Sequence, residues 1–129
     1  MNEIVNLQPV GISAIKKQFG EPVLKAFVTE LLIDFCEFFN VKNNMTEAQA
    51  MQTVDLILKN FYYFSLEDFK LCFENGKLGK SIKIYDRIDG SIIFEMLNKY
   101  AEIRSQAFSA KFEKEHEYWK YQAQKQKED

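Results

Sequence analysis

Hydrophobic residues recur at helical spacing along most of the chain. The widest apolar face follows Pro22, a residue that suits the first turn of a helix. Its members are Val23, Leu24, Phe27, Val28, Leu31, Leu32, Phe35, Phe38 and Phe39. A face this wide is typical of a helix at the centre of a core. A shorter helix is expected over residues 12–19, where Gly20 stops it.

Two capping signals predict further helix starts. Thr46 with Gln49 three residues later forms a capping box, which predicts a helix through about residue 60. Ser65 is followed by acidic residues in the same way and predicts a short helix over about residues 66–75. Gly76 lies where a left-handed residue would end that helix.

The second half of the chain predicts one more long helix. Asp89 or Ser91 provides its cap. Its apolar positions are Ile92, Ile93, Met96, Leu97, Tyr100, Ile103 and Phe108. After Phe108 the composition becomes highly charged, and we expect the helix to continue into this tail and to fray at its end.

These elements predict an all-α bundle of four or five helices, with a basic, glycine-containing loop and a long C-terminal helix. The alternation in SIKIYD also allows a short two-stranded element around residues 81–85. At 129 residues the chain has the size of one domain. We divide it into a helical domain, residues 1–108, and a charged helical tail, residues 109–129.

Composition narrows the classes of function. Seventeen basic and nineteen acidic side chains give a net charge of −2, which argues against binding nucleic acid or membrane by bulk charge and leaves a local patch open. Cys36 and Cys72 fall on apolar helix faces, which favours buried free thiols over a disulfide or redox pair. No leader peptide or membrane-spanning run is recognisable, so a cytoplasmic protein is expected.

The glycine-containing loop is the first candidate site. GKLGKS lacks the spacing of a phosphate-binding loop and does not follow a strand, so a nucleotide site is not expected. Basic side chains interleaved with an aromatic ring can instead hold a nucleic-acid backbone and stack on a base. The candidate residues are Lys77, Lys80, Lys83, Tyr85 and Arg87. The competing interpretation is a solvated loop whose lysines maintain solubility.

The aromatic side chains of the tail are the second candidate site. If the tail helix projects, they are exposed and predict a contact with a protein partner or with another copy. They are Phe108, Phe112, Tyr118, Trp119 and Tyr121. If the helix folds back on the bundle, the same residues are core, and periodicity does not decide between the two arrangements.

No group of residues predicts catalysis, a metal or a cofactor. His116 is the only histidine and has no Cys or second His beside it, which makes a poor metal site. Asp86 and Asp89 form a carboxylate pair in sequence, but Asp89 has a capping role and Asp86 can balance Arg87. An enzyme would need a deep pocket lined by Asp86, Asp89 and His116.

Part of the chain resembles a known group of proteins. The runs FSLEDFKLCFENGKLGK, YDRIDG and IIFEMLNKY, within residues 64–100, resemble a family of small uncharacterised helical proteins from Bacteroidetes phages and mobile elements. They are more loosely similar to helical domains of phage replication organisers and helicase loaders. The resemblance implies an accessory protein that binds replication proteins or DNA and has no chemistry of its own.

Two functional hypotheses follow. The first is a non-enzymatic, replication-linked adaptor that binds a protein through its C-terminal helix and DNA through the 77–87 loop. The second is a structural or self-assembling helical protein, virion-associated or homo-oligomeric, whose aromatic tail joins copies of the chain. Neither hypothesis includes a membrane or a small-molecule substrate.

Overall fold

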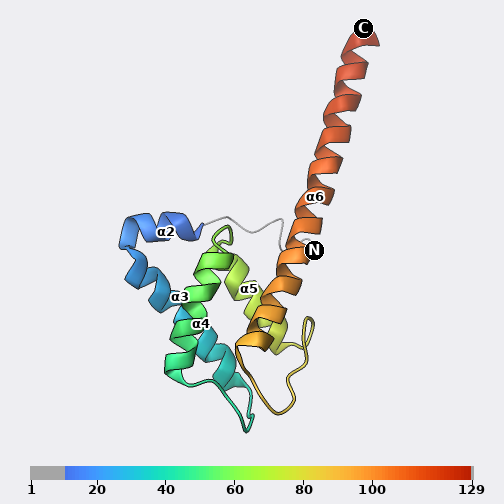
Figure 1. The fold of residues 1–129 in the computed structure, drawn as a ribbon. Coiled ribbons are helices and arrows are strands. Elements are labelled where there is room, and N and C mark those ends of the chain that lie inside the picture. The colour runs from blue at the N-terminus through green and yellow to red at the C-terminus, as the bar shows by residue number, and fades with distance from the viewer. Residues whose placement is uncertain (1–10, 129) are drawn as a thin grey trace.

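The computed structural model describes residues 11–128, with side chains through residue 126, and places them in an all-α fold (Figure 1). The predicted bundle with a long C-terminal helix is confirmed. The helices are α2 (Ile12–Phe19), α3 (Glu21–Phe38), α4 (Glu47–Asn60), α5 (Leu66–Lys77) and α6 (Gly90–Glu128).

Helix α3 lies at the centre of the bundle, as its wide apolar face predicts. It packs against α2, α4 and α5, while α6 packs against α4 and α5. Val28, Leu32 and Phe35 of α3 are completely buried. The Phe35 ring contacts the Phe73 ring of α5 at 5.5 Å between centroids, so aromatic packing joins these two helices.

The predicted capping boxes are both present. The Gln49 amide donates to the Thr46 hydroxyl at 3.1 Å, and the Thr46 amide donates to the Gln49 side chain at 2.9 Å. The Ser65 hydroxyl likewise accepts from the Asp68 amide at 3.1 Å. Asp89 caps α6, because its carboxylate accepts from the Ile92 amide at 3.1 Å. These contacts satisfy amides that the first helical turn leaves without partners.

The predicted role of Gly76 is wrong. Helix α5 continues to Lys77, and the left-handed residue that follows it is Gly79, with φ of 72°. Gly76 is buried within the helix, where an added Cβ would collide with the Met96 sulfur and lie 2.9 Å from Cε2 of Phe35. Glycine is needed here for close helix packing rather than for a turn.

The predicted two-stranded element around residues 81–85 is absent from the described residues. Among them only two isolated bridges form, and the nearer one joins Asn43 to Arg87. Buried and exposed side chains do alternate along this segment, because Ile82 and Ile88 are buried while Lys83 and Tyr85 are exposed. The segment is therefore extended and anchored by its isoleucines, but no neighbouring strand pairs with residues 81–85.

Helix α6 is 39 residues long and spans about 58 Å. Its first part is anchored in the core by Ile93, Met96, Leu97 and Tyr100. Every residue from 108 to 121 is exposed, and the helix extends beyond the bundle (Figure 1). The tail continues α6 without a break, as predicted, and it projects rather than folding back.

Candidate functional site

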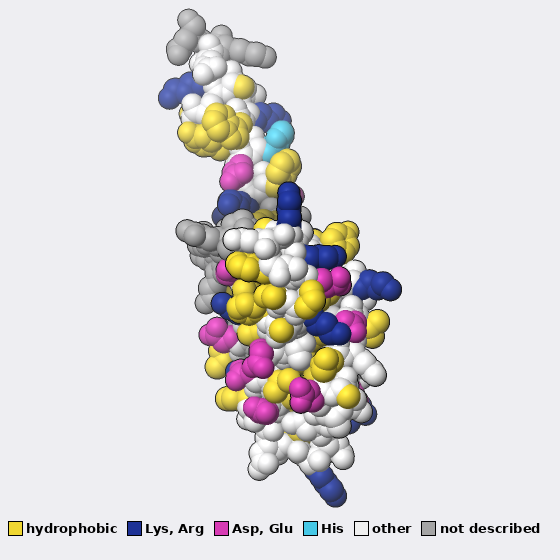
Figure 2. All heavy atoms as spheres, turned by 90° about the vertical axis from the view of Figure 1, so that its left-hand side faces the viewer, with side chains coloured by type: hydrophobic (Ala, Val, Ile, Leu, Met, Phe, Trp, Pro, Cys, Tyr) yellow, Lys and Arg dark blue, Asp and Glu magenta, His cyan; other side chains and the backbone are white. Residues whose placement is uncertain are grey.

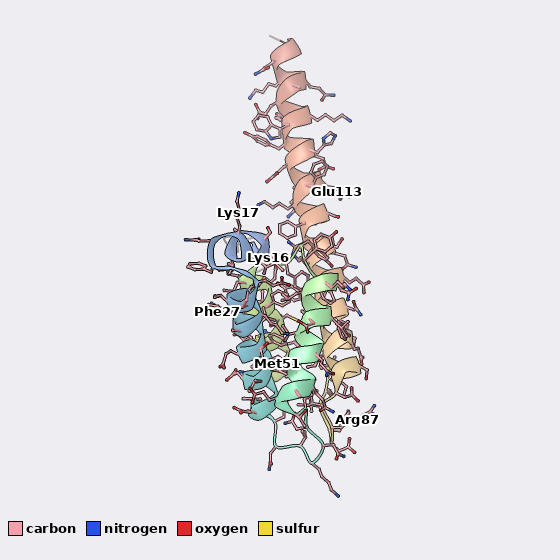
Figure 3. The ribbon with its side chains drawn as sticks, turned by 60° about the vertical axis from the view of Figure 1, so that its left-hand side comes forward. Lys16, Lys17, Phe27, Met51, Arg87 and Glu113 are labelled. Atoms are coloured by element: carbon pink, nitrogen blue, oxygen red, sulfur yellow. The ribbon has the colours of Figure 1, made fainter. Side chains whose placement is uncertain are left out.

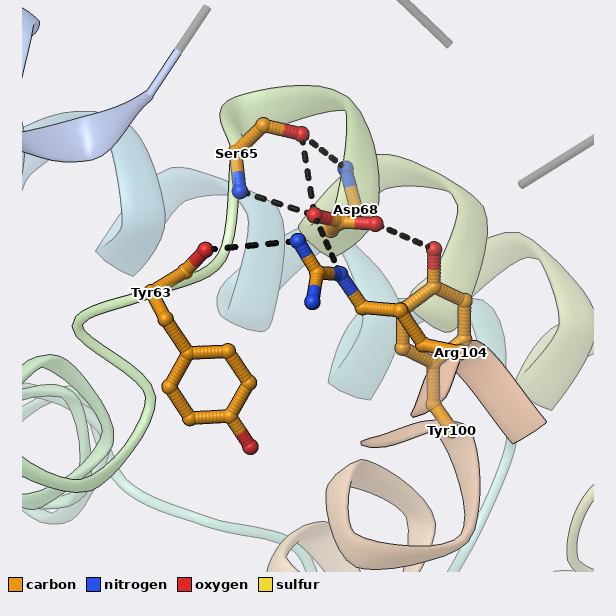
Figure 4. Close-up of polar contacts among 5 residues, drawn as sticks. All are labelled: Tyr63, Ser65, Asp68, Tyr100 and Arg104. Atoms are coloured by element: carbon orange, nitrogen blue, oxygen red, sulfur yellow. Dashed lines mark hydrogen bonds and ion pairs between the residues drawn. The ribbon is translucent and has the colours of Figure 1, made fainter. Parts of the chain in front are cut away.

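A buried carboxylate fixes the base of the projecting helix. The Asp68 side chain, 3% exposed, lies at the start of α5 and faces the middle of α6. It accepts from the Tyr100 hydroxyl at 2.7 Å and from Nε of Arg104 at 3.1 Å (Figure 4). It also accepts from the amide of Ser65 at 2.8 Å and from its hydroxyl at 3.0 Å. One side chain thus caps α5 and ties α6 to it.

Charges in this network are matched. The Arg104 guanidinium balances the Asp68 carboxylate, as a buried ion requires. Burial, followed by the hydrogen bond to Asp68, raises the pKa of the Tyr100 hydroxyl above its ordinary value. Tyr100 therefore remains a neutral donor at physiological pH and holds α6 in register with α5.

Arg104 also forms the floor of a groove at the base of the projecting helix. Its guanidinium carbon lies 4.9 Å from the Phe108 ring centre and 5.5 Å from the Tyr63 ring centre, within the range of cation–π attraction. The groove has a volume of about 660 Å³. It is lined by Tyr63, Ala101, Arg104, Ser105, Phe108, Ser109, Phe112 and Glu113.

Three aromatic residues continue from this groove along α6. Phe108, Phe112 and Trp119 are 40%, 69% and 68% exposed. At about 100° per residue they lie within about 40° of one another around the helix, so they share one face. We call these three residues the aromatic stripe. Figure 2 shows hydrophobic side chains on the projecting part of α6, interleaved with charged ones.

The structure separates the other two predicted tail residues from this stripe. Tyr118 is exposed and contacts Trp119 edge-on at 5.6 Å between ring centroids, so it lies beside the stripe. Tyr121 is exposed about 200° around the helix from Trp119, on the opposite face. Only one histidine accompanies them: the His116 ring stacks on Phe112 at 6.2 Å.

The basic loop is anchored at its end, and its charged side chains are only partly free of ion pairs. Lys80 and Lys83 are exposed and form no ion pair with any residue that the structure describes, and Tyr85 is 81% exposed. Arg87 is exposed but lies 3.4 Å from Asp89. Backbone hydrogen bonds from Asn43 to Asp86 and from Ile88 to Asn43 fix the end of the loop.

Lys77 does not belong to the same surface. It is the last residue of α5, pairs with Asp34 of α3 and lies 5.3 Å from the Phe38 ring centre. Of the five predicted loop residues, the other four are exposed to solvent. Arg87 lies at the end of the bundle opposite to the side from which Glu113 and the rest of the projecting helix extend (Figure 3).

Sequence reasoning missed Tyr63 and Arg104, which make the groove. Tyr63 lies in a run of three aromatic residues directly before Ser65, and this run gives no sign of a contact with α6. Arg104 interrupts an apolar helix face between Tyr100 and Phe108, and this interruption was the available signal. Its partner Asp68 is 36 residues away in the chain, a separation that no helical period reveals.

The residues considered for chemistry have other roles. Asp89 caps α6, and the hydrogen bond from the Ser91 hydroxyl is the main cause that lowers the pKa of its carboxyl. Within residues 11–128 no group of three or more His, Cys, Asp or Glu side chains is placed to hold a metal ion. None of the helices described has the length and apolar character needed to cross a membrane.

Comparisons with protein families, curated proteins and solved structures gave no match. The resemblance of residues 64–100 to phage and mobile-element proteins therefore stays a prediction.

Proposed function

We propose that the protein is a non-enzymatic adaptor in which the bundle holds α6 outward to bind another protein chain. The observation that carries this proposal is the exposed aromatic stripe of Phe108, Phe112 and Trp119 on a projecting helix. Large aromatic side chains are enriched where proteins meet. A helix with aromatic anchors on one face suits contact with a groove or with another helix.

The base of α6 supports the same proposal. Asp68, Tyr100 and Arg104 fix the direction in which the helix leaves the bundle. A binding element held in one direction loses less conformational freedom when it binds, and this favours affinity. Asp68 and Tyr100 would then serve binding by orienting α6, without touching the partner.

The link to replication rests on the resemblance of residues 64–100. We therefore propose as partner a replication protein of the same phage or mobile element. The test is calorimetric titration of the full chain with the replication proteins encoded beside it. The double variant Phe112→Ala, Trp119→Ala should weaken binding at least about 30-fold, as expected for loss of aromatic anchors at an interface centre.

A matched control comes from another exposed ring. Phe27 is half exposed on α3, away from the projecting helix (Figure 3). Phe27→Ala removes one exposed ring from another face and should leave binding unchanged. Equal affinity of the stripe variant and the wild-type chain would overturn the proposed function.

Contact with nucleic acid through the basic loop is a second candidate. It is favoured by the exposure of Lys80, Lys83, Tyr85 and Arg87 on a segment whose end is anchored by backbone hydrogen bonds. Alanine at the three basic positions should weaken binding of a fluorescent single-stranded oligonucleotide and reduce the magnitude of its salt slope by about 2. Lys16→Ala on α2 is the control, because it removes one exposed cation elsewhere. Absence of binding at low salt would exclude this candidate.

A further inference from the structure

We infer that the aromatic stripe binds the same stripe of a second copy of this chain. The two α6 helices run antiparallel, and Trp119 of each copy fills the groove at the base of the other. This inference rests on the proposed function, because it uses the surface that the adaptor presents; a second copy and a replication protein would compete for that surface.

The groove suits an indole ring. Tyr63 and Phe108 provide aromatic walls, and the Arg104 guanidinium lies between them. A tryptophan face placed over that guanidinium gains cation–π attraction, for which tryptophan is the best of the aromatic side chains. Glu113 on the rim offers a carboxylate that can accept from the indole N–H.

The spacing along α6 makes the surface complementary to itself. Along one face of α6, exposed or half-exposed residues follow one another at alternating steps of four and three residues. This is the heptad spacing of residues at the contact between two helices of a coiled coil. The exposed or half-exposed residues are Ala101, Ser105, Phe108, Phe112, Glu115, Trp119 and Gln122. When two such helices run antiparallel about a point between Glu113 and Lys114, Phe108 of each copy lies opposite Trp119 of the other. The contact then has two-fold symmetry and closes as a dimer.

Charge favours the antiparallel direction over the parallel one. Residues 113–117 contain three glutamates and one lysine, whereas residues 118–126 contain two lysines and no acid. In a parallel pair, the acidic segments would face each other and so would the basic ones. Like charges in direct opposition are unfavourable. In the antiparallel pair, residues 113–117 face residues 110–114, which contain two lysines and one glutamate.

The stripe supplies about two thirds of the area that a dimer needs. The stripe residues of two copies offer on the order of 800 Å² of aromatic surface, given 150–250 Å² for a fully buried ring. The other seam residues and the groove then need to contribute about 400 Å² to reach the lower end of specific interfaces, about 1,200 Å².

Sedimentation equilibrium of the full chain tests whether the dimer forms. We expect a monomer–dimer equilibrium in the micromolar range. Trp119→Ala removes one tryptophan from each side of the symmetric dimer, so it should raise the dimer dissociation constant on the order of 1,000-fold, at about 30-fold for each aromatic hot spot. Phe27→Ala should leave it unchanged. A chain that remains monomeric at several hundred micromolar, or a Trp119→Ala dimer as tight as the wild type, overturns the inference.

Cysteine cross-linking tests the direction. In the inferred dimer Ser105 of one copy lies opposite Gln122 of the other. Chains carrying Ser105→Cys and Gln122→Cys, mixed under mild oxidation, should therefore form the mixed disulfide far more readily than either chain forms its own. Cys36 and Cys72 are buried and free, so they do not compete. Predominant 105–105 and 122–122 products would indicate a parallel pair and would overturn the inference.

The two proposals fail in different ways. If the chain is monomeric but the stripe variants lose binding to a replication protein, the dimer is wrong and the adaptor stands. If the stripe variants change neither self-association nor the binding of a replication protein, both are wrong.

Discussion

At the scale of single residues, Asp68 is the side chain on which the position of α6 depends most. It is buried, and it pairs with Arg104 and Tyr100. Asp68→Ala leaves the guanidinium without its carboxylate and also removes the half of the α5 capping box in which the Asp68 carboxylate accepts from the Ser65 amide. Because breaking a buried pair from one side is costly, we expect the free energy of unfolding to fall by about 3 kcal/mol, measured by urea denaturation.

The control for Asp68 is an exposed ion pair. Asp55 pairs with Lys25 at 2.8 Å, but its side chain is largely open to solvent. Asp55→Ala should change the unfolding free energy by less than about 1 kcal/mol. Similar losses in the two variants would show that the Asp68 network does not anchor α6.

Gly76 gives a second prediction at this scale. In an exposed helix, Gly→Ala would stabilise by about 1 kcal/mol. Here the new Cβ meets Met96 and Phe35, so we expect Gly76→Ala to destabilise by about 1–3 kcal/mol in the same measurement. A gain in stability would show that the α5–α6 contact has room to relax.

The thiol of Cys36 gives a prediction for pH. Burial, together with the charge of Glu37, raises its pKa from 9.0 to about 11. Above pH 9 the thiol loses its proton in the unfolded chain while it keeps it in the folded chain. Deprotonation therefore favours the unfolded chain, and the free energy of unfolding falls as the pH rises from 9 toward 11. By pH 10 the wild type should lose about 1 kcal/mol more than Cys36→Ala does. Denaturant midpoints that fall in parallel for both proteins would contradict this.

At the scale of elements, α6 consists of an anchored part and a projecting part. The anchored part supplies core residues to the bundle, whereas residues 108–121 are exposed. Truncation after Ala107 should therefore reduce helix content in circular dichroism and leave the unfolding free energy of the bundle within about 0.5 kcal/mol. A large loss of stability would mean that the bundle needs the projecting part.

Local patterns in the sequence predicted the elements, and the errors arose where distant residues decide. The capping boxes at Thr46 and Ser65 are contained within four residues, so they could be read directly. The pattern around Gly76 predicted a left-handed helix end, whereas its role is close packing against Met96 and Phe35. These residues belong to other helices, so the local pattern does not reveal that role. Residues 81–85 alternate like a strand because one side is buried, but a strand also needs a partner, which the alternation does not provide.

The candidate site was predictable to a similar extent. The sequence predicted five aromatic contact residues because they stand out in a polar tail, and three of them, Phe108, Phe112 and Trp119, share one face of α6. It did not reveal whether the tail projects, since periodicity defines a face without saying what covers it. The groove was not predictable, because Tyr63 and Arg104 come together only when α5 and α6 pack.

At the scale of the whole molecule, the two candidate surfaces lie far apart. The basic loop precedes α6 at one end of the bundle, and the aromatic stripe lies beyond the other end (Figure 3). The two surfaces can therefore be occupied at the same time. In the inferred antiparallel dimer, the N-termini of the two α6 helices lie roughly 70 Å apart, given the rise of a helix. The dimer would hold its two basic loops outward at about that separation.

The last prediction concerns this separation, because the length of a rigid DNA duplex determines whether it can reach both basic loops. At about 3.4 Å per base pair, a duplex shorter than about 20 base pairs cannot reach both loops of one dimer, whereas a duplex of 40 base pairs can. Bridging makes the second contact intramolecular, so the wild-type chain should bind the longer duplex at least about tenfold more tightly. Fluorescence anisotropy at low salt, and at protein concentrations that favour the dimer, measures the ratio of the two affinities.

Two variants serve as controls. Trp119→Ala should remove the length dependence and keep the weaker single-loop affinity. Alanine at Lys80, Lys83 and Arg87 should weaken binding to both lengths. A length dependence that persists in Trp119→Ala would mean that the second contact does not come through α6.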